Sequence, residues 1–445
     1  MGNYLIKGAQ VVNEGKTFFA DVLVRNDRIE KIASSIGSPT SGFTEINAEG
    51  QHLLPGVIDD QVHFREPGLT HKGEIFTESR AAVAGGLTSF MEMPNTNPQT
   101  ITQERLEEKY RIGAARSAAN YSFYMGATND NLEEVLKTRK DNVCGVKVFM
   151  GSSTGNMLVD NEHTLSTLFS ECDHLIAIHS ESESVIKSNL ERIKEQYGND
   201  IPMSAHPLIR DEEACYQSTQ KAVALARKHD TRLHILHIST AEELDFFSNH
   251  IPLKDKKITS EVCVHHLWFA ADDYSSLGGQ IKCNPAIKAP HHRSALWQAL
   301  LDDRLDIIAT DHAPHTREEK GGDYLHCPSG LPLVQHSLLM MLEAHKQGKI
   351  TLEKLVQKMS HAPAQCFRIS DRGYIREGAK ADLVLVDLDA KTTVDRSNIL
   401  YKSGWSPLEG YTFSARIVST FINGNLVFDK GKVIDGIRGE RLLFA

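Results

Sequence analysis

Several chemically capable side chains stand at the ends of short apolar runs in the middle of the chain. His179 follows the run IAI, His237 follows LHIL, and Asp311 follows IIAT. Imidazole and carboxylate groups bind Zn²⁺ and similar divalent ions, and a carboxylate can also carry a proton during catalysis. The types and positions of these residues therefore predict a metal-dependent centre that activates water.

Lys147 is unusual because it lies inside the apolar run GVKVFMG. An ammonium group is costly to bury in such surroundings unless it has a partner. A buried salt bridge would provide that partner. Alternatively, reaction of the amine with carbon dioxide would give a carbamate, an anion that can bridge two cations. The residues alone leave both possibilities open.

Length and composition limit the class of protein that must position these residues. The chain has 445 residues, a formal net charge of -9 and 40% hydrophobic residues, which is ordinary for a globular protein. An acidic balance argues against a general nucleic-acid or anionic-membrane binder. The 7 cysteines are scattered without a C-x-x-C pair, and neither a signal peptide nor a long apolar segment is seen. We therefore expect a cytoplasmic protein with free thiols that binds neither membranes nor nucleic acids.

The middle of the chain alternates short apolar runs with helical stretches. This alternation predicts an α/β fold, a (β/α)8 TIM-like barrel over residues 55–372. In such a barrel the carboxyl ends of the strands meet at one face, which would bring the candidate residues together. The eight predicted strands lie within residues 56–64, 88–94, 121–127, 145–151, 175–181, 233–239, 258–266 and 306–312.

Both ends of the chain have a strand pattern. Residues 1–54 and 373–445 carry β-branched runs broken by turn residues, and Asn423-Gly424 is a strong hairpin signal. We expect the two ends to form one small β-sandwich domain beside the barrel.

Other histidines and cysteines are predicted to be structural. His234 precedes His237 by three positions, and an odd offset in a strand points to the opposite face. We therefore assign His237 to the site and His234 to packing against helices. Packing, core or solvated positions are also predicted for His265-His266, Cys263, Cys283 and the pair His291-His292 in a turn.

Six motifs carry a resemblance to a known family. The run PGVIDDQVHFREPG (55–68) resembles the first-strand signature of the amidohydrolase superfamily. EMPNTNP (92–98), GVKVFMG (145–151), AIHSE (177–181), LHILHIST (233–240) and IATDHAPH (308–315) follow in the family's order. The nearest branch is dihydroorotase, the cyclic-amide hydrolase of pyrimidine biosynthesis, and the resemblance extends to the terminal β segments.

The resemblance implies roles for individual residues around one or two Zn²⁺ ions. His63 matches a ligand of the more buried metal, and Lys147 matches the lysine that becomes the bridging carbamate. His179 and His237 match the ligands of the second metal. Asp311 matches the aspartate that binds the first metal and acts as general acid and base.

The resemblance also implies a small-molecule substrate, dihydroorotate or its ring-opened form N-carbamoyl-aspartate, and suggests a homodimer. The guanidinium of Arg65 is a planar fork that suits a carboxylate. The residues matching substrate contacts are Arg65, Asn95 and His315 for the carboxylate, Asn284 for the ring, and Ser329-Gly330 for backbone hydrogen bonds.

Gln61 departs from the family, whose first strand normally reads His-x-His. A glutamine oxygen is a neutral and weaker ligand for Zn²⁺ than imidazole. Three interpretations follow: a binuclear site with a weakened first metal, a site with one metal bound chiefly by His179 and His237, or a catalytically impaired dihydroorotase-like subunit. A different cyclic amidase, an allantoinase or hydantoinase, is the other alternative. GVKVFMG slightly favours it, whereas Arg65 and Asn95 argue against it.

Overall fold

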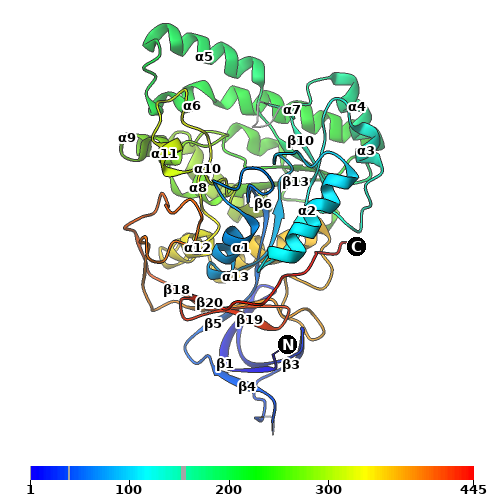
Figure 1. Cartoon of the computed structure of the whole chain (residues 1–445), viewed down its shortest axis with the longest axis vertical. Helices are drawn as coiled ribbons and strands as arrows, with labels where there is room; N and C mark the ends of the chain where they lie inside the picture. The colour runs from blue at the N-terminus through cyan, green and yellow to red at the C-terminus, as the bar shows by residue number, and fades with distance from the viewer. Residues whose placement is uncertain (1, 39–40, 152–156) are drawn as a thin grey trace.

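The predicted barrel forms in the central part of the chain. A computed structural model describes residues 2–38, 41–151 and 157–445 and places a barrel above a smaller β domain (Figure 1). Its parallel ladders run β6-β7-β8 and β9-β10-β11-β12-β13-β14. The barrel strands are β6 (Val57–Val62), β7 (Leu87–Glu92), β8 (Asn120–Phe123) continued by β9 (Met125–Gly126), β10 (Val146–Phe149), β11 (Ile176–His179), β12 (Leu233–Ile235), β13 (Ile258–Cys263) and β14 (Ile307–Ala309).

The barrel closes between its first and last strands. Val62 at the end of β6 forms a parallel bridge with His312, and the His63 N–H donates to the His312 carbonyl at 2.7 Å. One apolar cluster combines Ile58 of β6 with Ile307 of β14 and with Phe367 of the helix α14 (Ala362–Phe367).

Helices surround the strands, as the alternating pattern predicts (Figure 1). The helix α7 (Glu212–His229) shows why they begin and end where they do. The Asp211 side chain accepts from the Ala214 N–H, and basic residues occupy its last turn, where cations are favourable. The other helices are α1 (Ile75–Ala84), α2 (Gln103–Arg116), α3 (Leu132–Leu136), α4 (Glu162–Glu171), α5 (Glu183–Tyr197), α6 (His206–Ile209), α8 (Val264–Trp268), α9 (Tyr274–Leu277), α10 (Pro290–Leu301), α11 (Arg317–Lys320), α12 (Ser337–Lys346) and α13 (Leu352–Val356).

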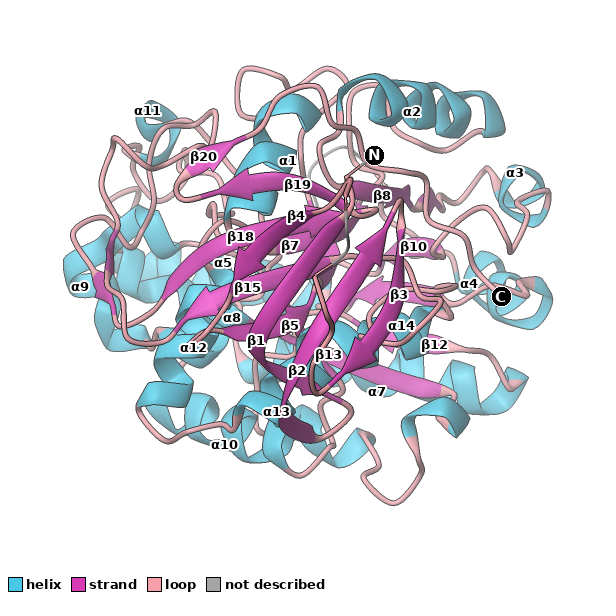
Figure 2. Cartoon of the chain, turned by 90° about the horizontal axis from the view of Figure 1, so that it is seen from below, coloured by secondary structure: helices cyan, strands magenta, loops and turns pink. Residues whose placement is uncertain are grey.

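Strands from the two ends of the chain form the smaller domain, as predicted. They make one nine-stranded sheet in which β5 pairs antiparallel with β15 (Figure 2). The chain ends therefore meet in one hydrogen-bonded unit. The strands are β1 (Tyr4–Asn13), β2 (Lys16–Arg25), β3 (Arg28–Ala33), β4 (Thr44–Asn47), β5 (His52–Pro55), β15 (Leu383–Asp387), β18 (Arg416–Ile422), β19 (Asn425–Asp429) and β20 (Lys432–Val433); β16 (Thr392–Thr393) pairs separately with β17 (Thr412–Phe413).

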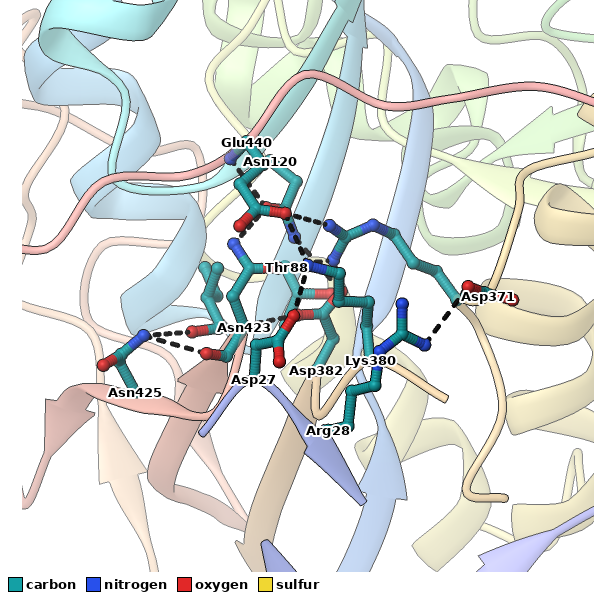
Figure 3. A network of polar contacts seen from close by, with 12 residues as sticks. Asp27, Arg28, Thr88, Asn120, Asp371, Lys380, Asp382, Asn423, Asn425 and Glu440 are labelled. Carbon is teal, nitrogen blue, oxygen red and sulfur yellow. Dashed lines mark hydrogen bonds and ion pairs between the residues drawn. The ribbon is translucent and has the colours of Figure 1, made fainter. Parts of the chain in front are cut away.

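A buried polar network joins the two domains (Figure 3). The Arg372 guanidinium pairs with Asp382 and donates to the Asn423 side chain at 2.7 Å and to Glu440 at 3.0 Å. Asn120, on the barrel strand β8, accepts from Asn423 at 2.9 Å and donates to Asp382 at 3.1 Å. The network thus connects the barrel to the terminal segments through hydrogen bonds in which each of these side chains has a partner.

The prediction that His291 and His292 lie solvated in a turn was wrong for the turn and for His292, whereas His291 is exposed as predicted. Pro290 opens the helix α10 instead of a solvated turn, because proline suits the first helical position. His292 is buried, with its Nε2 2.9 Å from Glu212. None of the described helices combines the length and apolar character needed to cross a membrane.

Candidate active site

A cavity of about 300 Å³ opens at the carboxyl ends of the barrel strands. It gathers the predicted site residues from eight segments of the chain, and only His315 of that set stands just behind the wall. The lining residues are Gln61, His63, Arg65, Asn95, Lys147, Phe149, His179, His237, Asn284, Asp311, Ala313, Pro328, Ser329 and Gly330.

His179 and His237 face each other inside this cavity. Nδ1 of His179 lies 3.0 Å from Nε2 of His237. Burial lowers the pKa of both rings, so both are neutral near pH 7 and have lone pairs to offer. Two converging imidazole nitrogens of this kind fit a metal ion.

The position of His237 also corrects the prediction for His234. β12 ends at Ile235 and His237 has a φ of 41°, so the alternation of side chains stops before His237. His234 lies inside the barrel, with its Nε2 3.2 Å from Asp60 on β6, which is not a neighbouring strand. The offset rule failed because it assumes that the strand continues.

Glu181 orients His179, a role that the sequence reasoning missed. Its carboxylate lies 3.0 Å from Nε2 of His179 and pairs with Arg210. Burial alone raises the pKa of Glu181, but Arg210 and His179 outweigh it and lower the pKa to about 2. A carboxylate on the far nitrogen of a histidine is the usual support of a metal ligand. The run AIHSE contained the residue, but its partner Arg210 is distant in sequence.

Lys147 has a buried amine without a partner. Its Nζ has no hydrogen-bond partner among the described residues, and it lies 4.5 Å from the centre of the Phe149 ring. Burial lowers the pKa of the amine to about 7, against the opposing charges of Asp311 and Glu261. The salt-bridge alternative therefore finds no support in the described residues, whereas a neutral amine suits carbamate formation.

Asp311 is the centre of a second group of contacts. Its Oδ1 lies 3.1 Å from Nε2 of His63 and accepts from Nε2 of Gln61 at 3.1 Å. Nδ1 of His63 is 2.9 Å from the Asn95 side-chain oxygen, which leaves Nε2 of His63 facing the carboxylate. Gln61 turns its oxygen away from Asp311 toward Cys263, whose Sγ lies 3.8 Å from it.

These residues fit a divalent metal ion. The lone pairs of His179 and His237 converge, the amine of Lys147 is without a partner, and the donors are all nitrogen or oxygen atoms. The fit is poorer beside Gln61, which presents an N–H instead of an oxygen to Asp311.

One end of the site is cationic. Nε of Arg65 donates to the Pro314 carbonyl at 3.0 Å, and its NH2 lies 3.0 Å from Nε2 of His315. Lys72, which sequence reasoning missed, places Nζ 3.1 Å from Nδ1 of the same ring. Burial, together with Arg65 and Lys72, lowers the pKa of His315, so the ring is neutral. This end of the site therefore suits an anionic group of a ligand.

The cavity wall also carries neutral polar groups. The side-chain oxygen of Asn284 is buried without a hydrogen-bond partner, so it can accept from a ligand N–H. Ser329 accepts from His315 through its carbonyl at 3.0 Å, and the Gly330 N–H donates to the Lys282 carbonyl at 2.8 Å. A ligand contact to Gly330 would therefore use its carbonyl.

Comparison with known proteins agrees with this fold. The model of the Amidohydrolase family matches residues 52–427. The chain is 31% identical to a dihydroorotase of Halobacterium salinarum (95% of this chain, 96% of the relative) and 32% identical to an allantoinase of Solibacter usitatus (99% and 97%). The structure of an L-hydantoinase (dihydropyrimidinase) from Arthrobacter aurescens superposes with a TM-score of 0.94 at 27% identity, covering all of both chains. With its barrel, its terminal β domain and this cavity, the chain belongs to the amidohydrolase family, among the enzymes that hydrolyse cyclic amides.

Proposed function

We propose that the protein is a dihydroorotase, which hydrolyses the cyclic amide of dihydroorotate to N-carbamoyl-aspartate and closes it again in pyrimidine biosynthesis in the cytoplasm. The observation that carries the proposal is the cationic end of the cavity, where Arg65 lines the wall and His315 and Lys72 lie behind it. Dihydroorotate has a ring carboxylate that these groups would hold, whereas allantoin and unsubstituted hydantoin have none. The similar identities to a dihydroorotase and an allantoinase leave the substrate to be decided by the site.

A metal ion held by His179 and His237, with Lys147 as a carbamate, would supply a water of lowered pKa and polarise the ring carbonyl. The Asp311 carboxylate takes the proton of the attacking water. As the carbon–nitrogen bond breaks, Asp311 returns the proton to the leaving ring nitrogen. The product carries a new carboxylate and an open carbamoyl chain, and the reverse sequence closes the ring.

The remaining residues orient the ring. Arg65, which lines the cavity, holds the ring carboxylate, and His315 contacts the guanidinium from behind the wall. Asn95 also lines the cavity, and its oxygen orients His63. The unpartnered oxygen of Asn284 accepts from a ring N–H. These contacts aim the reacting carbonyl at the histidine pair.

The metal is Zn²⁺, and we propose that the active site binds one ion tightly, at His179 and His237. Gln61 directs its amide N–H at Asp311, which weakens the first position. The Gln61→His variant restores an imidazole there, and we expect its metal content to rise by one ion per chain. An unchanged content would show that glutamine suffices for a binuclear site.

Activity assays test the substrate. We expect the zinc-loaded protein to interconvert dihydroorotate and N-carbamoyl-aspartate and to leave allantoin and hydantoin unchanged. Turnover of allantoin or hydantoin without turnover of dihydroorotate would contradict the proposed substrate and identify the protein as an allantoinase or hydantoinase. A folded, metal-loaded protein without turnover of any of them would support the impaired-subunit alternative. Light scattering would test the predicted homodimer.

A further inference from the structure

Three potential metal ligands lie together beneath the floor of the cavity. Cys263 ends β13, and His265 and His266 follow in the helix α8. One ligand atom from each lies within 4.8 Å of the others, and the three residues are at most 3% exposed. None of them lines the cavity.

The two histidines have ring nitrogens without hydrogen-bond partners. By hydrogen-bond geometry, both nitrogens of His265 and Nδ1 of His266 are buried without a partner, and the Thr310 backbone interacts with the His265 ring without meeting that geometry. Buried polar atoms normally have hydrogen-bond partners, so three unpartnered nitrogens in one place indicate a binding partner for them, such as a metal ion. Nε2 of His266 lies 3.1 Å from the Pro285 carbonyl, to which it donates, and its Nδ1 therefore carries a lone pair. A histidine held in this way by a carbonyl is typical of a metal ligand.

Gln61 separates these residues from the catalytic carboxylate. Its Nε2 donates to Asp311, and its oxygen lies 3.8 Å from Sγ of Cys263 on the other side. The cluster is therefore distinct from the histidine pair and Lys147 in the cavity. It uses none of the residues assigned to the proposed reaction.

We propose that Cys263, His265 and His266 bind a structural Zn²⁺ ion of their own. One thiolate and two imidazoles are a donor set typical of zinc. Tetrahedral bonds of about 2.3 Å to sulfur and 2.0–2.1 Å to nitrogen place ligand atoms about 3.5 Å apart, so the three atoms need to close by only about an ångström. The thiol loses its proton on binding, and because the residues are buried, the ion enters as the chain folds.

Cobalt substitution tests the site, because among the groups of potential metal ligands in the described residues only this cluster contains sulfur. The proposed active-site ligands are nitrogen and oxygen atoms, so they give no thiolate-to-cobalt charge-transfer band in the near ultraviolet. We expect that band in the full-length protein refolded with Co²⁺, and we expect Cys263→Ser to abolish it. Cys283→Ser is the matched control, because Cys283 is equally buried and its Sγ contacts the same Pro285 carbonyl at 3.3 Å. It should keep the band.

Metal content provides the second measurement. Zinc per chain should fall by one in Cys263→Ser and in His265→Gln and should stay unchanged in Cys283→Ser. A wild-type cobalt protein without the band overturns the proposal, and so does a band that survives in Cys263→Ser. If Cys263→Ser does not fold, the cobalt spectrum of the wild type and the zinc content of His265→Gln test the proposal instead. A band without dihydroorotate turnover would count against the proposed function and leave this site standing.

Discussion

Two buried polar regions of this molecule differ in how completely their groups are partnered. At the domain junction, Arg372, Asp382 and Asn423 bind one another directly. In the cavity, the amine of Lys147 and the side-chain oxygen of Asn284 have no hydrogen-bond partner among the described residues. Lys147 is as buried as Arg372 and Asp382, so burial alone does not distinguish the two regions. We infer that a network in which every polar group has a hydrogen-bond partner stabilises the fold, whereas buried polar groups without a partner are available to bind a ligand.

The comparison predicts opposite consequences for substitutions in the two regions. Removing one member of a satisfied network leaves a buried charge without compensation and lowers stability. Removing an unpartnered group that binds the ligand lowers activity but leaves the stability of the fold unchanged or higher.

Asp311→Asn should have the largest effect of these substitutions, and the effect should be on activity. The variant keeps the shape of the side chain but removes the carboxylate that carries the proton. We expect kcat for dihydroorotate to fall by about 10²–10⁴-fold, the usual contribution of general acid–base catalysis. The free energy of unfolding, measured with urea, should not decrease by more than about 1 kcal/mol. Retained activity would assign the proton transfer to another group.

Arg372→Met should produce the converse result. It leaves the Asp382 carboxylate buried without its guanidinium, and we expect the free energy of unfolding to fall by about 3–5 kcal/mol. The kcat of the folded protein should stay within a factor of two or so, because the network is remote from the cavity. Arg25→Met is the control: it breaks the pair with Glu30 at the surface and should leave the denaturation midpoint unchanged. A junction variant as stable as the wild type would remove the distinction between the two regions.

Arg65→Lys tests whether the shape of the guanidinium, and not only its charge, matters for substrate binding in the cavity. Lysine keeps the charge but loses the planar fork. We expect KM for dihydroorotate to rise roughly 10–100-fold, the value of a hydrogen bond to a charged group. Lys72→Met should raise KM less, because Lys72 contacts His315 and is shared with Glu319 at 3.2 Å. Steady-state kinetics distinguish the two, and equal effects would mean that only charge matters at this end.

The sequence predicted those features that depend on local pattern. The barrel strands, the terminal β domain and the residues of the cavity wall follow from apolar runs, turn signals and family motifs. Partners that are distant in sequence could not be predicted: Glu181 pairs with Arg210, and Lys72 meets His315. That His237 faces the cavity although His234 also lies inside the barrel depends on the end of β12 at Ile235 and the positive φ of His237, which no sequence pattern indicates.

Lys147 gives the smallest expected effect, a change in how carbamate formation depends on pH. The step joins the neutral amine to carbon dioxide and releases a proton, so its rate follows the unprotonated fraction of Lys147. With a pKa of about 7, lowered by burial, that fraction falls about tenfold from pH 8 to pH 6 and levels off above pH 8. An ordinary lysine would show no plateau there, because its amine becomes neutral only near pH 10.4 or so.

Reactivation of metal-free protein with Zn²⁺ at a fixed concentration of dissolved carbon dioxide measures this dependence. Because the charge of Asp311 raises the pKa of Lys147, Asp311→Asn should move the midpoint to lower pH, as followed by zinc uptake. A rate that keeps rising steeply past pH 8 would mean that Lys147 is solvated or paired before metal binding. The polar groups of the cavity would then be as completely partnered as those of the domain junction, and the difference between the two regions would need another explanation.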